Sequence, residues 1–372
     1  MSRNRQLLAN GIALEIGDKK YRILDLMSEN GASCLVYMAE VLSNRLLKRK
    51  EPKNQIGINS STTKFVIKEF YPKEYSQYIQ RDKSGKLIVA DMGQKLFNNG
   101  RMRFTGGIAR QVAISYADSN NSTLGRPEAY TDVNGTAYSI LKLGIGTTLK
   151  DADRSALSVC EIAQIMVSLC DAISELHIRN QLYLDVKPSN IFLFDKIMGE
   201  SRRISLFDFD TVYEKGNLPH DIPYSPQWAP DEQCLQRIEE ITEATDVYAI
   251  GAVFYWLLTG EKVSEDTPTY ILNDEFTFLN RAKILIGKES LIEQTKNILT
   301  CMLNREPNMR TNNLGKIMYM FEDLEHISND TGSGYYKHYL SKSSESGIGL
   351  EQSYMVGLML KNRQKQINGG KK

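Results

Sequence analysis

The sequence has few cysteines, almost no net charge and no long apolar run. Its five cysteines are scattered over 372 residues and form no CxxC pair, which argues against a disulfide scaffold or a zinc site and favours a reducing compartment. The formal net charge is +1, so nothing in the overall charge favours nucleic acid as a partner. No apolar run approaches the ~20 residues of a membrane span, and residues 1–20 are too polar for a signal peptide. We therefore expect a soluble, cytoplasmic protein.

The chain contains two regions of different character. Strand-like runs fill the first region, at Tyr21–Met27, Leu35–Val41 and Lys64–Phe70, followed by a helix near Arg103–Ala117 and a strand in TAYSILKL. From about residue 149, apolar residues recur at helical spacing. The expected helices there span residues 159–176, 246–258, 291–303 and 314–324. A polar stretch at 44–63 is expected to be a surface insertion.

The stretch YLDVKPSN contains three residues suited to phosphoryl transfer. Moving a γ-phosphoryl group needs a carboxylate that orients and deprotonates the acceptor hydroxyl, a cation against the phosphate, and oxygen ligands for magnesium. Asp185 fits the first role, Lys187 the second, and the amide oxygen of Asn190 the third. A solvated surface loop is the competing interpretation of these residues alone.

Two further residues strengthen the phosphoryl-transfer interpretation. Asp208 follows an apolar run, in DFD, where its carboxylate can bind magnesium that bridges two phosphates. Lys68 lies inside the apolar strand FVIKEF, where an ammonium group is costly unless it reaches water or meets an anion. The phosphates of a nucleotide would be such an anion.

Together these motifs resemble a eukaryotic-type serine/threonine protein kinase, and most of all its bacterial members. The resemblance covers roughly residues 20–325. FVIK is similar to the V-A-I-K strand, YLDVKPSN to the catalytic loop, DFD to D-F-G, WAPDE to A-P-E and DVYAIG to the D-x-x-x-x-G helix. The late arginine of the family is matched by Arg310, and its A-P-E acid by Asp231. Sugar and antibiotic kinases usually lack the A-P-E-like segment, the D-x-x-x-x-G helix and the late arginine, so a protein substrate is favoured.

The resemblance implies an α+β, protein-kinase-like fold of two lobes. We expect an N-terminal segment at 1–20, a β-rich lobe with polar insertions at 21–141, a mainly helical lobe at 142–327 and a polar tail at 328–372. The implied function is transfer of the γ-phosphoryl group of ATP, with Mg²⁺, to serine or threonine hydroxyls of proteins.

The resemblance also implies the role of each site residue. Asp185 and Lys187 would be catalytic, and Asn190 and Asp208 would bind the metal. The resemblance gives the ATP-binding set as Lys68, Gly31, Val36, Leu141, Lys142 and Leu143. Asp246 and an Asp231–Arg310 pair would be structural supports.

The sequence also departs from the family pattern. Of the expected glycines in the loop before Val36, only Gly31 is present. The helix at 103–117 offers no glutamate to pair with Lys68, and Glu128 is a candidate replacement from outside it. Leu184 replaces the arginine that receives a phosphorylated activation loop, so we expect no phosphorylation switch. A pseudokinase that binds nucleotide or proteins remains the alternative.

Overall fold

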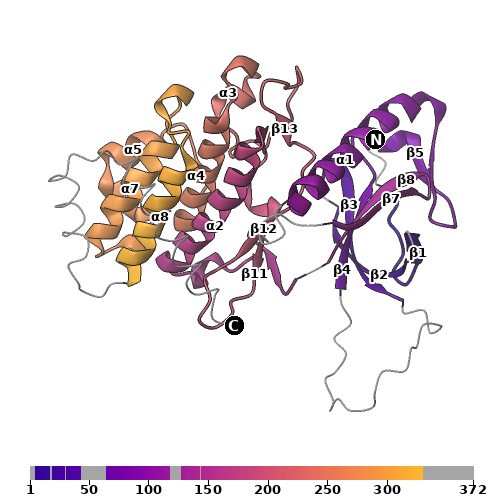
Figure 1. Ribbon diagram of the computed structural model, residues 1–372, viewed down its shortest axis with the longest axis horizontal. Coiled ribbons are helices and arrows are strands. Elements are labelled where there is room, and N and C mark those ends of the chain that lie inside the picture. Colours follow the sequence, from indigo (N-terminus) through magenta and orange to yellow (C-terminus); the bar gives the residue numbers. More distant parts are fainter. Residues whose placement is uncertain are drawn as a thin grey trace, which may run out of the picture. The chain divides into compact units, whose positions relative to one another are not determined.

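A computed structural model describes residues 5–16, 19–29, 31–42, 64–117, 127–142 and 144–329. These residues form two compact units (Figure 1). The β-rich unit comprises the described residues up to Gly146 together with Phe207–Val212, and the helical unit comprises Thr147–Leu206 and the described residues from Tyr213. The polar stretch at 44–63 and residues 330–372 of the expected tail lie outside the described residues.

The β-rich unit is built on one antiparallel sheet. Its strand order is β1-β2-β3-β4-β8-β7. The strands are β1 (Ala13–Ile16), β2 (Lys19–Ser28), β3 (Cys34–Val41), β4 (Lys64–Phe70), β7 (Pro127–Val133) and β8 (Thr136–Lys142). In β3, Leu35, Tyr37 and Ala39 are buried at alternate positions, as the two-residue period of a strand requires.

Helix α1 (Asp91–Ala117) packs against β7 and β8, and a small hairpin of β5 (Ile79–Arg81) and β6 (Leu87–Val89) precedes it. Phe97 and Phe104 of α1 contact the ring of Phe70 at the end of β4, with ring centroids 5.2 and 5.6 Å away. This aromatic contact fixes α1 beside the strand that carries Lys68.

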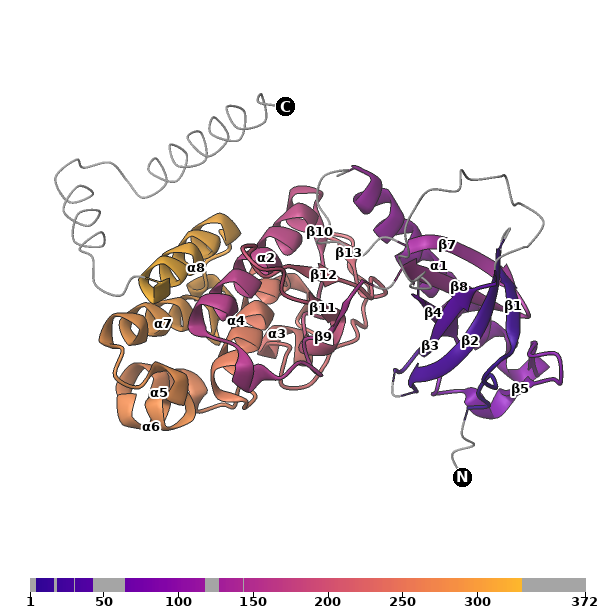
Figure 2. The same ribbon diagram turned by 90° about the horizontal axis from the view of Figure 1, so that it is seen from below.

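The helical unit is organised around α2 (Val159–Ile178) and α4 (Glu243–Thr259), with α8 (Leu314–Asn329) packed on α2 and α7 (Glu289–Met302) on α4 and α8 (Figure 1 and Figure 2). Ser158 and Glu161 form a capping box at the start of α2. Nearly all of α4 is buried, which explains its apolar residues on every side.

Smaller elements complete the helical unit. They are β9 (Gly146–Thr148), β10 (Gln181–Leu182), β11 (Ile191–Phe194), β12 (Ile204–Leu206), β13 (Tyr213–Glu214), α3 (Asp231–Cys234), α5 (Thr267–Asn273) and α6 (Glu275–Arg281). No helix among the described residues is long and apolar enough to cross a bilayer.

The expected strands at 21–27, 35–41 and 64–70 and the four expected helices of the second region are confirmed, with boundary shifts of a few residues. The expected start of the first helix is wrong, because α1 begins at Asp91 and not near Arg103. The polar stretch before it also contains the hairpin β5–β6, which its composition did not indicate. The compact units divide after Gly146, whereas we expected a lobe boundary between residues 141 and 142, and Phe207–Val212 returns to the β-rich unit.

Candidate active site

Lys68 lies on β4, where it pairs with Val36 of β3 on one side and Ser139 of β8 on the other. Its Nζ lies 3.6 Å from Oδ1 of Asp208, and it also lies over the ring of Phe207. Two residues far apart in the sequence are therefore neighbours within the β-rich unit.

The charge state of Lys68 is set by two opposing effects. Burial of the side chain lowers its pKa, but the carboxylates of Asp208 and Asp210 outweigh burial, and the pKa is raised above its ordinary value. Lys68 therefore carries its positive charge at neutral pH, as a ligand for phosphate oxygens must.

Asp210 replaces the glycine of D-F-G, and its carboxylate lies against α1. A Cβ atom added at Gly107 would lie 3.0 Å from both Asp210 Oδ1 and the carbonyl oxygen of Phe209. Gly106 is different, since a Cβ there would meet nothing closer than 3.7 Å. Glycine at 107 is thus the residue that makes room for the Asp210 carboxylate.

The sequence of α1 contains one acidic residue, Asp91, which stands at its first position. The glutamate that would pair with Lys68 is therefore missing from this helix, as the sequence suggested. The side chain of Glu128, the candidate replacement, lies outside the described part of the structure. Asp210 is the described carboxylate that raises the pKa of Lys68 next after Asp208.

The turn between β2 and β3 holds the single expected glycine of the phosphate-binding loop, Gly31. A Cβ there would lie 3.2 Å from the carbonyl oxygen of Cys34, so the turn is tight at this point. Val36 follows on β3 and is partly buried. Of the residues expected near adenine, Leu141 is partly buried and Lys142 is exposed at the end of β8, while Leu143 lies outside the described residues.

In the helical unit, Asp185 is the centre of a hydrogen-bond network. Lys187 Nζ and Asn190 Nδ2 both donate to its Oδ2, at 2.6 and 2.8 Å, and Ser225 Oγ donates to its Oδ1 at 2.7 Å. Lys187 Nζ also donates to Ser225 Oγ at 2.8 Å. The structure thus brings together three of the predicted site residues and adds the hydroxyl of Ser225.

The backbone beneath Asp185 is held by a buried carboxylate. Asp246 of α4 is fully buried, and it accepts hydrogen bonds from the amides of Tyr183 and Leu184 at 2.9 and 2.8 Å. Its Oδ2 also lies 2.9 Å from Nε2 of His177. Leu184 has a positive φ of 58°, which is unfavourable for a leucine and needs such support. The expected role of Asp246 as an anchor of this loop is confirmed.

The predicted Asp231–Arg310 pair is wrong. Arg310 forms a fully buried pair with Glu232, with Nη1 and Nη2 at 2.7 and 3.0 Å from its two carboxylate oxygens. Asp231 instead pairs with Arg305 at the surface. Neighbouring residues of a helix point in directions about 100° apart, so α3 buries only one of the two acids. The sequence WAPDE does not indicate which of its two adjacent acids is buried.

An apolar cluster occupies the surroundings of Leu184. The buried side chains of Leu182, Leu184, Ile222 and Ile241 pack together. The main chain of Ile222 is also held by the side-chain amide of Gln236, which accepts from its N–H at 2.8 Å and donates to its carbonyl at 2.9 Å. This cluster is referred to below as the Leu184 cluster.

Comparison with known proteins agrees with this geometry. Residues 130–321 match the family model described as "Protein kinase domain". The chain belongs to the protein kinase family.

The chain is similar to several curated serine/threonine-protein kinases. It is 26% identical over 207 residues to serine/threonine-protein kinase 17A of Oryctolagus cuniculus, an alignment that covers 54% of this chain and 49% of the relative. It is 28% identical over 128 residues to serine/threonine-protein kinase Pkn1 of Myxococcus xanthus, covering 33% of this chain and 18% of the relative. The chain thus spans about half the length, or less, of these relatives.

Among solved structures, the chain resembles one titled "PpkA-294 apo form", with a TM-score of 0.61 and 22% sequence identity. The match covers 85% of this chain and 99% of that chain. This likeness supports the two-lobed protein kinase fold.

Proposed function

We propose that this chain is an ATP-dependent protein kinase that phosphorylates serine or threonine residues of a protein substrate. The observation that carries the proposal is the network around Asp185, in which carboxylate, ammonium, amide and hydroxyl groups are already hydrogen-bonded to one another. Such preorganisation is what positioning an acceptor hydroxyl for phosphoryl transfer requires.

Asp185 is the proposed base. Its Oδ1 already accepts a hydrogen bond from the hydroxyl of Ser225, and an acceptor hydroxyl of a substrate would donate to the carboxylate in the same way. The proton would pass to Asp185 as the bond to the γ-phosphorus forms, and ADP would leave. Lys187 would offset the charge on the transferred group.

Each unit offers an oxygen donor of the kind that magnesium prefers, and Asn190 and Asp208 are the residues that would hold the metal. Because the amide nitrogen of Asn190 is bonded to Asp185, its carbonyl oxygen is the atom left for a metal. The carboxylate of Asp208 is partly exposed. Bound Mg²⁺ would neutralise charge on the phosphates, while Lys68 would hold the α- and β-phosphates.

Asp210 is the proposed substitute for the missing helix glutamate. It is one of two carboxylates that favour the charged form of Lys68, and Gly107 leaves room for it. The absence of an acid from the rest of α1 after Asp91 favours the second candidate function, a pseudokinase that binds nucleotide as a switch.

The deciding experiment is phosphoryl transfer from radiolabelled ATP and Mg²⁺ to the protein itself or to a generic acceptor, with Asp185→Asn as the matched variant. We expect labelled serine or threonine with the wild-type protein and at least a hundredfold less with the variant. Absence of label from both proteins, with a melting temperature still raised by ATP, would establish the pseudokinase. If ATP shifts no melting temperature either, nucleotide binding itself is refuted.

A further inference from the structure

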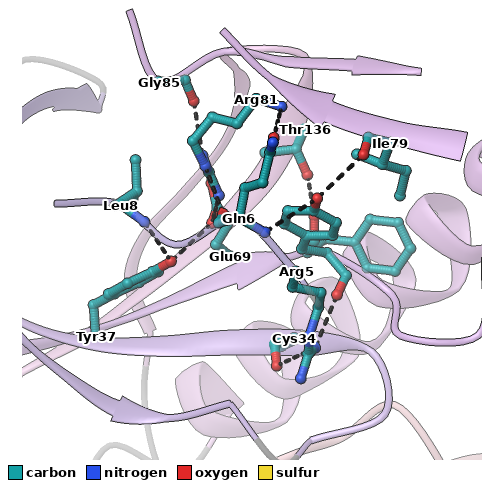
Figure 3. Close-up of polar contacts among 12 residues, drawn as sticks. Arg5, Gln6, Leu8, Cys34, Tyr37, Glu69, Ile79, Arg81, Gly85 and Thr136 are labelled. Atoms are coloured by element: carbon teal, nitrogen blue, oxygen red, sulfur yellow. Dashed lines mark hydrogen bonds and ion pairs between the residues drawn. The ribbon is translucent and has the colours of Figure 1, made fainter. Parts of the chain in front are cut away.

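The N-terminal segment at residues 5–8 inserts a charged side chain into the β-rich unit. Arg5 is 9% exposed, although arginine is usually a surface residue. Its Nη1 donates to the carbonyl oxygen of Cys34 at 3.0 Å (Figure 3) and to that of Tyr71 at 2.9 Å. Its Nη2 donates to the carbonyl oxygen of Glu29. All three of these acceptors belong to the main chain.

The three carbonyls that Arg5 contacts lie on both sides of the Gly31 turn and at the end of β4. Glu29 and Cys34 flank the tight turn at Gly31, and Tyr71 directly follows β4, the strand that carries Lys68. One guanidinium therefore joins both ends of the turn to that strand. The planar fork of arginine can hold several acceptors at once, which an ammonium group cannot do in the same geometry.

The backbone on one side of the turn is also paired with the chain beyond β4. Tyr71 N donates to Ser33 O at 2.9 Å, and Lys73 N donates to Ala32 O at 2.8 Å. On the other side, Arg5 Nη2 donates to the carbonyl oxygen of Glu29. Arg5 thus adds a hydrogen bond at Glu29, one residue beyond Ser28, where the pairing of β2 with β3 ends.

The segment that delivers Arg5 is itself anchored in the core. Arg81 Nε donates to Gln6 O at 2.8 Å, and its guanidinium forms a buried pair with Glu69 of β4, at 2.9 and 2.6 Å. Leu8 is buried, and its amide donates to the hydroxyl of Tyr37 (Figure 3). Arg5 is therefore held in place before any ligand binds.

We propose that Arg5 is a positioning residue for the triphosphate of ATP, which clamps the turn at Gly31 in the shape that receives phosphates. This inference rests on the proposed function. A loop with one of the usual glycines gains less from backbone approach to phosphate oxygens, and an external clamp offsets that deficit by limiting how far the turn can open.

The first test needs no nucleotide. In Arg5→Met, which keeps the length of the side chain but donates no hydrogen bond, hydrogen exchange should rise about tenfold in peptides that cover 28–36. Arg22→Met is the matched control, because Arg22 lies on β2 and pairs with Glu40 at the surface. Unchanged exchange in Arg5→Met, or an equal rise in the control, would overturn the clamp.

The second test separates positioning from general destabilisation. The KM for ATP should rise about tenfold in Arg5→Met with kcat nearly unchanged, while affinity for adenosine, which has no phosphates, stays the same. The KM of Arg5→Lys for ATP should lie between those of the wild-type protein and Arg5→Met. Equal loss of ATP and adenosine affinity would overturn the positioning role. Normal ATP binding by wild type and variant alike would refute only the Arg5 inference, whereas a wild-type protein that binds no ATP would refute the proposed function as well.

Discussion

Replacing Ile222 by alanine tests whether the Leu184 cluster holds the segment around Ile222 in place without phosphorylation. Ile222 is fully buried, with a relative accessibility of 0%. It packs on Leu184, the residue before Asp185. In kinases that are switched by phosphorylation, an arginine at the position of Leu184 would bind a phosphate. In this chain, apolar contacts of Leu184 and hydrogen bonds from the side chain of Gln236 to Ile222 stand in place of such a phosphate contact.

The size of the effect follows from the burial. Truncating a buried isoleucine to alanine costs about 2–5 kcal/mol, and we take the lower limit because the cluster is small. About 2 kcal/mol corresponds to a shift of about 30-fold between the ordered and the released segment. If that segment orders the acceptor, kcat/KM for a protein substrate should fall by up to that factor, with the KM for ATP nearly constant.

The assay is steady-state phosphorylation of a protein acceptor, before and after phosphatase treatment. Leu235→Ala is the matched control, because Leu235 is 67% exposed and its truncation leaves the cluster intact. We expect the control to match wild type, and phosphatase to change either protein by less than about tenfold, since the cluster has no phosphate to lose. Wild-type kcat/KM in Ile222→Ala, or a larger phosphatase effect, would refute the reasoning.

Two further predictions concern the supports of the site. Gly107→Ala should lower kcat/KM at least about tenfold, because its Cβ would lie 3.0 Å from two neighbouring oxygens. Gly106→Ala is the control, because a Cβ there would meet nothing closer than 3.7 Å. Equal activities of the two variants would count against the proposed role of the Asp210 carboxylate. Arg310→Met should destabilise the fold by about 3–5 kcal/mol, since it leaves a buried carboxylate unpaired, whereas Arg305→Met at a surface pair should cost less than about 1 kcal/mol. Denaturant unfolding of both variants would measure this difference, and similar losses would contradict the assignment of the buried pair.

The sequence was sufficient where chemistry restricts the choice of residue. Lys68 inside an apolar strand and Asp246 at the start of an apolar helix are expensive unless each meets a partner, so their motifs pointed to real contacts. The choice between Asp231 and Glu232 could not be made in the same way. Both are acids at adjacent positions, and only the packing of α3 decides which one is buried.

Arg5 escaped the sequence analysis for a different reason. Its partners are main-chain carbonyls, and every residue has a carbonyl, so no side-chain pattern marks the contact. The hairpin β5–β6 was missed because its strands are three residues each, too short for a two-residue period to stand out from a polar stretch.

Helix α1 has no acidic residue after Asp91, whereas Asp210 stands where the family has a glycine. This combination bears on whether the unusual motifs reflect loss of function. A Cβ at 107 would lie 3.0 Å from Asp210 Oδ1, so any larger residue there would have to displace that carboxylate. A helix glutamate added to Asp208 and Asp210 would place three negative charges beside one ammonium group, which like-charge repulsion disfavours. If glycine at 107 and aspartate at 210 had arisen from unrelated decay, nothing would require them to fit one another. Their fit, with the raised pKa of Lys68, supports the proposal that Asp210 takes the place of the helix glutamate.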